Sequence, residues 1–380
     1  MIDSALAVAQ PGLDLTYADL RARAGGLHAA LREAGVGPGT VVAAAVTDLA
    51  DLAVTMVAVN ALGAVAYTLP DPAAVARWAE RLEAAAVVVA DDSASSGNLG
   101  CPVVDLDRIA PSTEAITGSP GGPGIAVDAP HLGAVVRVNG LDAIVDELAA
   151  RLGIGAADRL LTVAEIHADL TALGLLLALR SGATAIAPGR LLDNGDALRR
   201  VADRYQATVL IAPPHRAELL GGGRMAALRA AVLVRDPVPA RLPDTLRRVA
   251  GPQLRLYTAT GRPDTGVLDT LRDGASGWPL GSPTVDVIVR DTPIGEAEPP
   301  VAADGSERIR RIVADALALP GLDVGTNLFE VGASSLELVR AVAQLEADLD
   351  FEADLDELLD APFVQTLIRQ YATVREASTT

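Results

Sequence analysis

Residues 327–338 read N-L-F-E-V-G-A-S-S-L-E-L, and they predict a turn of small residues that leads into an amphipathic helix. Ser334 and Glu337 have the spacing of a capping box, in which each side chain satisfies a free amide of the first turn. Ser335 then falls beside the positive end of the helix dipole, where an attached phosphate is favoured. We expect its hydroxyl to face solvent, within reach of a modifying enzyme. Alone, these four residues indicate only a capped helix, so their surroundings decide the interpretation.

The surroundings of this turn predict a small helical bundle. The first helix has one apolar face, made by Ile309, Ile312, Val313, Ala316 and Leu317. The second helix begins at Ser334 or Ser335, and we expect its inner side to carry Leu336, Val339, Val342, Ala343 and Leu349. Short helices over residues 354–359 and 364–371 complete a unit of four helices, which is small but able to fold alone.

Upstream of this bundle, residues 291–300 read D-T-P-I-G-E-A-E-P-P, a composition typical of a semi-extended tether. Before it, helical and strand-like segments alternate as in an α/β domain with a sheet of several parallel-type strands. Helices are expected over residues 20–34, 51–62, 141–152, 170–179 and 197–205. Strands are expected over residues 41–46, 84–90, 160–163, 183–187, 208–212, 230–234, 254–257 and 285–289. We therefore predict an α/β domain over 1–290, a linker over 291–305 and a helical domain over 306–375.

Composition excludes several classes of function. Half of the 380 residues are hydrophobic, so a sizeable core is expected, and the net charge of −18 disfavours binding to nucleic acid or to an anionic membrane. The most apolar run, Leu170 to Leu179, is too short to span a bilayer. The N-terminus has no secretory pattern and Cys101 is the single cysteine, which favours the cytoplasm.

The charge is unevenly distributed along the chain. Residues 304–380 contain 15 acidic residues and six arginines, a net charge of −9. This predicts basic partner surfaces and fast, salt-sensitive encounters, although solubility alone would also favour such a charge. All 31 basic residues are arginines, so no chemical step here can use a lysine amino group.

The serine turn with its flanks resembles the carrier domain of nonribosomal peptide synthetases over nearly all of residues 307–371. The usual G-G-[HD]-S-L is replaced by Gly332-Ala333-Ser334-Ser335-Leu336, and L-L-D-A-P-F-V at 358–364 follows at the family distance. The resemblance implies that a separate phosphopantetheinyl transferase moves 4′-phosphopantetheine from coenzyme A onto Ser335. The thiol of that arm would then hold an aminoacyl or related acyl group as a thioester.

The first 290 residues resemble the large N-terminal part of an adenylation domain, an adenylate-forming enzyme of the same assembly lines. The motifs that carry the resemblance are L-T-Y-A-D-L at 15–20, G-V-G-P-G at 35–39, N-A-L-G-A-V-A-Y at 60–67, L-P-D-P at 69–72, S-G-A-T at 181–184 and P-L-G-S-P at 279–283. The order and spacing of these motifs imply an α/β fold with parallel-type sheets flanked by helices.

The residues that perform adenylation in that family are missing from this sequence. The family's Gly/Ser/Thr-rich phosphate loop is absent, because residues 131–140 run straight through its place and Gly121-Gly122-Pro123-Gly124 has no Ser, Thr or Lys. The family's metal-binding glutamate is replaced by Gly261. The C-terminal lid and its lysine are also missing, and a single oxyanion donor is typically worth ~2.7–4 kcal/mol. We therefore expect no adenylation and assign no catalytic residue.

The sequence also resembles one motif of the pocket in which the adenylation family binds its amino acid. Ala168-Asp169-Leu170-Thr171 aligns with the family's F-D-x-S, whose aspartate pairs with a substrate α-amino group, so Asp169 is a candidate vestigial pocket residue; a surface relic is the alternative. None of the four histidines has the spacing of a metal site.

These observations leave three hypotheses. The favoured one is a carrier protein that is loaded in trans by a separate adenylating enzyme, serves condensation or tailoring enzymes, and uses its pseudo-adenylation domain as a docking platform. The second is a divergent amino-acid adenylating enzyme that loads its own arm. The third is an interaction or regulatory protein that is never loaded.

Overall fold

The computed structural model describes residues 3–70, 72–90, 99–112, 125–129, 134–189, 191–192, 194–234, 238–261, 268–273, 276–280, 284–290, 303–317, 328, 335–349, 353, 358 and 363–377. The chain divides into two compact units, Met1–Arg290 and Asp291–Thr380. Each unit is described by itself.

The first unit contains two β-sheets. The larger sheet has the strand order β15-β14-β13-β12-β11-β9-β10-β1-β2, and the smaller has the order β16-β8-β7-β4-β3-β5-β6. The strands of the larger sheet are β1 (Leu6–Gln10), β2 (Leu13–Thr16), β9 (Arg159–Thr162), β10 (Thr184–Ile186), β11 (Val209–Ala212), β12 (Ala230–Val234), β13 (Arg255–Gly261), β14 (Leu268–Asp273) and β15 (Ser276–Pro279). Those of the smaller sheet are β3 (Val41–Ala45), β4 (Val65–Thr68), β5 (Ala86–Val89), β6 (Val103–Asp105), β7 (Ile125–Ala129), β8 (Ala134–Asn139) and β16 (Thr284–Arg290).

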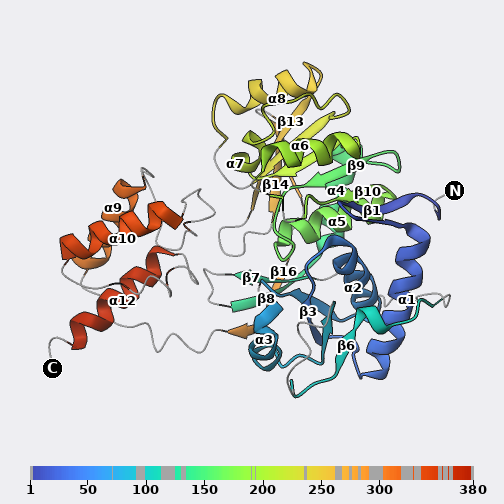
Figure 1. Cartoon of the computed structure of the whole chain (residues 1–380), viewed down its shortest axis with the longest axis horizontal. Coiled ribbons are helices and arrows are strands. Elements are labelled where there is room, and N and C mark those ends of the chain that lie inside the picture. The colour runs from blue at the N-terminus through green and yellow to red at the C-terminus, as the bar shows by residue number, and fades with distance from the viewer. Residues whose placement is uncertain are drawn as a thin grey trace. The chain divides into compact units, whose positions relative to one another are not determined.

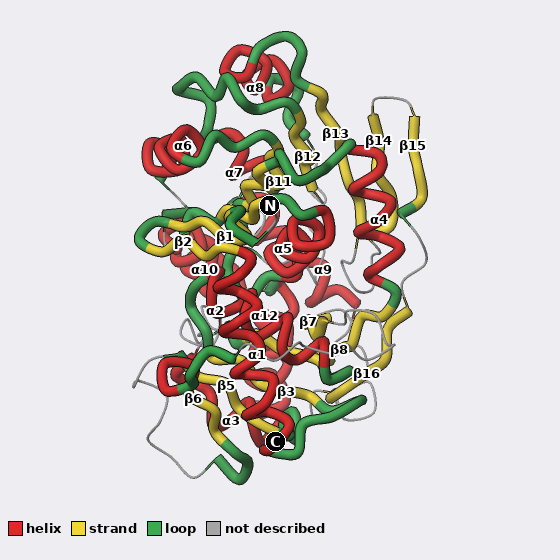
Figure 2. The backbone as a smooth tube through the Cα atoms, turned by 90° about the vertical axis from the view of Figure 1, so that its right-hand side faces the viewer, coloured by secondary structure: helices red, strands yellow, loops and turns green. Residues whose placement is uncertain are grey.

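Helices cover both faces of each sheet, so the unit is built in layers (Figure 1). The helices are α1 (Tyr17–Glu33), α2 (Leu49–Ala61), α3 (Val75–Arg81), α4 (Leu141–Leu152), α5 (Asp169–Ser181), α6 (Gly195–Arg204), α7 (Pro214–Glu218) and α8 (Leu242–Ala250). The core between the two sheets includes buried residues of α1, α2, α4 and α5. A second core packs α6, α7 and α8 on the outer face of the larger sheet, and a third packs α3 on the outer face of the smaller one. Figure 2 shows α6 and α8 on the side of β11 and β12 opposite to α5.

The alternation of side chains along the strands explains these layers. In β9, Leu160 belongs to the core between the sheets and Leu161 to the outer core, as expected when successive strand residues point to opposite faces. Helices α2 and α5 are apolar on nearly every side and are buried over most of their length. A helix that is hydrophobic all round needs cover on all sides, which its place between two sheets provides.

The predicted parallel-type strands are present in both sheets, but each sheet also contains antiparallel pairs. Both sheets are mixed, because β2, β14, β15, β8 and β16 are antiparallel to a neighbour. The reason is the length of the connections: a parallel pair needs a crossover of a dozen residues or more, whereas β1 and β2 are joined by Pro11 and Gly12 alone. Gly12 has φ of 96°, a left-handed value that suits glycine in such a tight turn.

The second unit is helical, with α9 (Ala303–Ala316), α10 (Ser335–Leu349) and α12 (Val364–Ala377) around one small core. The expected face of α9 is confirmed for Ile309, Ile312 and Val313, which are all buried. The face predicted for α10 is confirmed for the buried Val342 and for Leu349, which packs against the core, but it is wrong for Val339 and Ala343, which are exposed. Its buried side is made by Leu338, Ala341, Val342 and Leu345. Val339, which we expected inside, is 41% exposed, because the true stripe repeats at three and four residues from Leu338. The predicted helix over 354–359 lies mostly outside the described residues.

Among the described helices, none combines the length and the apolar character that a membrane span requires.

Candidate functional site

The helix α10 begins at Ser335, which is one of the two starting residues that the sequence predicted. The helix is 15 residues long, so its first-turn amides and its dipole provide a well-formed positive end at this serine. Leu338, Leu345 and other residues of one face anchor α10 in the core of the second unit. The proposed capping box cannot be followed further, since Ser334 and the side chain of Glu337 lie outside the described residues. The backbone at Ser335 suits a phosphate ester.

Asp169 lies in the other unit, at the start of α5. The strand β9, which precedes α5, pairs with β10 on one side and with β11 on the other. The connection after β9 runs along one face of the sheet through α5, and the connection after β11 runs along the opposite face through α7. Adjacent loops therefore diverge at the carboxyl ends of β9 and β11, the topological switch point at which open α/β sheets bind ligands. The half-buried Asp169 begins the helix that follows β9, next to this switch point.

An ion pair that no sequence pattern indicated joins the two connections that diverge at this switch point. The guanidinium of Arg216 in α7 donates a hydrogen bond to the carboxylate of Glu165 in the loop before α5. The Arg216 side chain is 11% exposed, whereas that of Glu165 is 46% exposed. Burial acts to raise the pKa of Glu165, but the hydrogen bond and positive charge of Arg216 outweigh it and hold the pKa below its usual value. The two residues are 51 positions apart, which explains why local patterns did not find the pair.

The structure also locates the segments that resemble adenylation motifs. Tyr257–Gly261 forms most of β13, and it offers no carboxylate at the position of the family's glutamate. β7 and β8 form an antiparallel pair with Ala129 opposite Ala134, so only residues 130–133 connect them. These four residues, like Gly121–Gly124, lie outside the described residues. In the resemblance to adenylation domains, the family's phosphate loop would stand in this connection.

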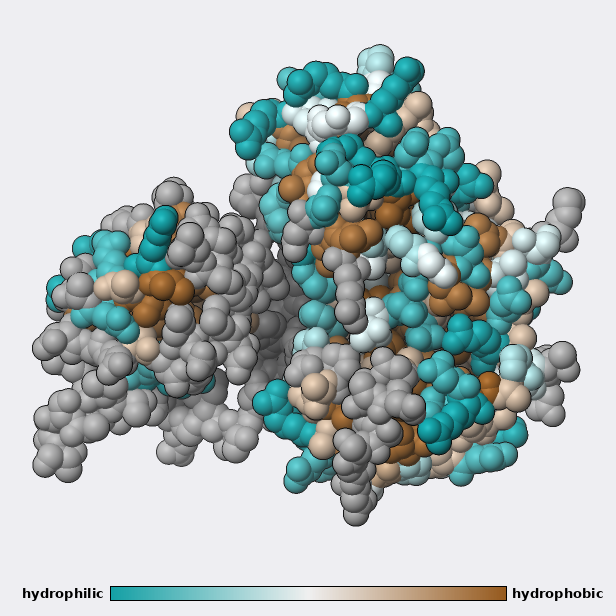
Figure 3. Space-filling model, in the orientation of Figure 1, coloured by the Kyte–Doolittle hydropathy of each residue, from teal (hydrophilic) through white to brown (hydrophobic). Residues whose placement is uncertain are grey.

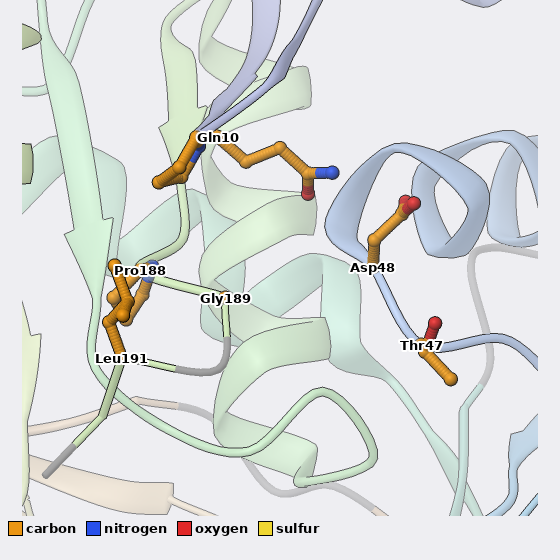
Figure 4. Close-up of a pocket in the computed structure, with 7 residues that line it drawn as sticks. Gln10, Thr47, Asp48, Pro188, Gly189 and Leu191 are labelled. Carbon is orange, nitrogen blue, oxygen red and sulfur yellow. The ribbon is translucent and has the colours of Figure 1, made fainter.

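A pocket of about 360 Å³ lies where the ends of β1 and β10 meet the start of α2 (Figure 4). It is lined by Gln10, Pro11, Thr47, Asp48, Pro188, Gly189 and Leu191. Two of its polar side chains cap the first turn of α2. Gln10 Oε1 accepts a hydrogen bond from the Leu49 amide at 2.8 Å, and Asp48 Oδ1 accepts one from the Asp51 amide at 2.8 Å. Neither predicted site residue lines this pocket. The described residues contain no cluster of histidine, cysteine and acidic side chains suited to a metal ion.

A segment near each end of the chain matches a known protein family. Residues 307–370 match the phosphopantetheine attachment site family, and residues 3–118 match the AMP-binding enzyme family. A phosphopantetheine attachment site is therefore present, as the serine turn predicted, and Ser335 lies within the matched range. The AMP-binding match covers only part of the first unit.

Two curated relatives are a nonribosomal peptide synthetase and a phenyloxazoline synthase. The chain is 28% identical over 301 residues to the probable non-canonical nonribosomal peptide synthetase CymA of Salinispora arenicola, covering 72% of this chain and 4% of that protein. It is 28% identical over 286 residues to the phenyloxazoline synthase MbtB of Mycobacterium tuberculosis, covering 68% of this chain and 19% of that protein. The chain thus spans only a small part of the length of either relative.

The solved structure of the nonribosomal peptide synthetase FmoA3 has the same fold. It superimposes with a TM-score of 0.63 at 20% identity over 96% of this chain and 48% of that chain. The predicted fold class, an α/β adenylation-like domain followed by a helical carrier region, is confirmed. This chain is homologous to nonribosomal peptide synthetase modules, and in it a partial AMP-binding domain precedes a phosphopantetheine carrier domain.

Proposed function

We propose that this chain is a carrier protein of natural-product biosynthesis, that Ser335 bears the phosphopantetheine arm, and that a separate enzyme loads it. In this proposal residues 1–290 form a non-catalytic docking platform, residues 291–305 the tether and residues 306–375 the carrier domain. The partners are a phosphopantetheinyl transferase, a trans-acting adenylating enzyme, and condensation or tailoring enzymes that use the thioester. The single cysteine favours a reducing, cytoplasmic setting.

The position of Ser335 carries the proposal. It is the first residue of α10, and it falls inside the range that matches the carrier family. A phosphodiester attached there would lie at the positive end of a 15-residue helix. A serine buried in the helix middle would have neither this electrostatic support nor access to a transferase.

Three features support loading in trans. The connection between β7 and β8 has four residues in place of a phosphate-binding loop. β13 ends at Gly261, which has no side chain to hold a metal ion. The chain has no lysine to stabilise the charge that develops on carboxylate and phosphate. Without these groups the first unit lacks the electrostatic stabilisation that adenylation requires.

The test is the transfer of phosphopantetheine itself. The purified chain, incubated with coenzyme A and a broad-specificity phosphopantetheinyl transferase, should gain one prosthetic group in its intact mass. Ser335→Ala should abolish the gain, whereas Ser334→Ala, the same change at the adjacent serine, should retain it. An unmodified wild-type chain, or modification that persists in Ser335→Ala, contradicts the proposal.

A second candidate function is self-loading by a divergent adenylating enzyme. The observation in its favour is Asp169 next to the switch point of an AMP-binding fold, where a substrate amino group could be held. Amino-acid-dependent exchange of pyrophosphate into ATP by the purified chain would establish this function and overturn loading in trans. A chain that is never modified in its host would instead favour a purely regulatory role.

A further inference from the structure

The outer helices of the first unit carry an arginine-rich surface on an otherwise acidic chain. Residues 195–250, which include α6, α7 and α8, contain ten arginines and five acidic residues. The rest of the chain contains 21 arginines and 44 acidic residues. Figure 3 shows hydrophilic side chains gathered over α8 and α6. We call this surface the arginine face and define it by Arg200, Arg204, Arg224, Arg241, Arg247 and Arg248, all of which are exposed.

Packing explains why these arginines face outward. In α6, Leu198, Val201 and Ala202 are buried against the larger sheet, which leaves Arg200 and Arg204 exposed four residues apart on the opposite side. In α8, Leu242 and Leu246 are buried in the same way. Both helices pack on one face of one sheet, so their exposed sides share a surface.

The acidic residues on this surface do not neutralise it. Asp196 pairs with Arg199, Glu218 with Arg241, and Asp244 with Arg247. The Gln206 side-chain amide donates to the Asp203 backbone carbonyl at 2.6 Å and to its carboxylate at 3.5 Å. The pair between Arg247 and Asp244 is 3.7 Å long, and Asp244 is 84% exposed, so it contributes little. Within the described residues, Arg200, Arg204, Arg224 and Arg248 have no acidic partner. Among the described residues of this surface, the six arginines that define it and Arg199 therefore face four carboxylates.

We propose that the arginine face is a docking surface for an acidic carrier domain, and that the domain it binds is the C-terminal unit of a second copy of this chain. That unit has the complementary charge, with a net of −9 over residues 304–380. It also presents Val339 as an exposed apolar side chain on α10, which an interface can cover. The inference rests on the proposed function in one respect, that the first unit is a docking platform. A charge-based contact suits a carrier, which must leave each partner quickly.

The total charge of the chain gives this contact a distinctive salt dependence. Each copy has a net charge of −18, so two copies repel one another at long range. At about 0.01 M salt the Debye length is ~30 Å and this repulsion acts between whole molecules; at ~0.15 M it falls to ~8 Å, and only adjacent groups interact. At about 1 M even adjacent exposed pairs are largely screened. We therefore expect association to be strongest at intermediate salt.

Sedimentation velocity of the full chain at several protein and salt concentrations tests the proposal. The weight-average sedimentation coefficient should rise with protein concentration near 0.15 M salt, and this rise should shrink at both lower and higher salt. The double variant Arg200→Glu/Arg204→Glu should weaken self-association by about tenfold, since it replaces two attractive contacts with repulsive ones. Val339→Ser should weaken it to a smaller extent.

Matched controls separate this surface from general charge effects. Arg32→Glu/Arg77→Glu makes the same charge change on α1 and α3, at exposed arginines outside the arginine face, and should associate like the wild type. Ser335→Ala should also associate normally, so a failure of phosphopantetheine transfer and a failure of docking are distinguishable. A wild type that stays monomeric at every salt concentration overturns the proposal. So does an R200E/R204E variant that associates like the wild type, or a salt-dependent change of shape that does not depend on concentration, which would indicate docking within one chain.

Discussion

The buried carboxyl group of Asp51 should make the stability of the folded chain depend on pH. It is 8% exposed at the start of α2 and accepts a hydrogen bond from Arg23 at 2.7 Å. Burial, followed by the negative charge of Asp48, raises its pKa to about 6 in spite of Arg23. The pKa in the unfolded chain is about 3.9, so between these values the folded state holds a proton that the unfolded state has released. The resulting stabilisation is complete below about pH 4 and is lost as the pH rises through 6.

Replacing Asp51 by Asn should remove this pH dependence. Relative to the wild type, the free energy of unfolding of Asp51→Asn should increase by about 2–3 kcal/mol between pH 4 and pH 7. Urea unfolding followed by circular dichroism at both pH values measures the difference. Asp146→Asn, at an exposed position on α4, serves as the control. A gap between wild type and Asp51→Asn that stays constant with pH would show that Asp51 titrates normally.

The ion pair between Glu165 and Arg216 should be asymmetric in its energetics. Glu165→Gln leaves the Arg216 charge, which is 11% exposed, without its partner. We expect a loss of about 1–2 kcal/mol, below the 3–5 kcal/mol of a fully buried pair because Glu165 is partly solvated. Adding Arg216→Met should recover most of that loss. Because its folded pKa is lowered, the stabilisation from Glu165 should be present above about pH 4.3 and decline in acid.

A double-mutant cycle by urea unfolding gives the coupling free energy of this pair. A Glu165→Gln variant as stable as the wild type, or losses that simply add in the double variant, would mean that the two side chains are independent. The cycle also reports whether this ion pair holds the loop before α5 against α7.

At the scale of elements, the contact between α5 and β9 depends on a glycine. A Cβ built on Gly174 would lie 2.2 Å from Thr162 Oγ1, far inside van der Waals contact. Alanine has a helix propensity about 1 kcal/mol better than glycine, whereas overpacking costs about 1–3 kcal/mol. The cost of the clash should therefore exceed the gain in helix propensity.

We expect Gly174→Ala to destabilise the chain by about 1–2 kcal/mol, and Thr162→Ala in the same chain to restore part of the loss. Gly155→Ala is the control, because nothing lies within 4 Å of the Cβ that it would add. Thermal unfolding of the wild type and these three variants measures the effect. Equal stability of Gly174→Ala and Gly155→Ala would place α5 farther from β9 than the structure does.

Individual elements differ in how far the sequence could predict them. The helix α4 has the predicted bounds, because Gly140 and Gly153 flank it in left-handed conformation and five buried apolar residues repeat at helical spacing between them. The hairpin of β14 and β15 was missed, because its segments alternate without a strong apolar face and depend on β13 for pairing. β1 was missed for a related reason, since its main partner β10 lies far along the chain.

At the scale of the whole molecule, local patterns identified the carrier region and pointed to Ser335 as its candidate serine, but they did not predict the geometry of the first unit. The turn before Ser335 is recognisable because capping and attachment both use adjacent residues. The switch point is not, because it depends on the order in which β9, β10 and β11 pair. Strand order and the contact between Glu165 and Arg216 arise only when distant segments pack, so a one-dimensional pattern contains no direct trace of them.

The proposed function requires that this carrier receive its cargo from another protein. The most direct measurement is the intact mass of the holo-protein after incubation with ATP, Mg²⁺ and a mixture of amino acids, with no other enzyme present. We expect the phosphopantetheine arm to stay unacylated, because the proposed function gives the first unit no phosphate loop, no metal-binding glutamate and no lysine. An aminoacyl adduct on the arm, absent when ATP is left out, would contradict it.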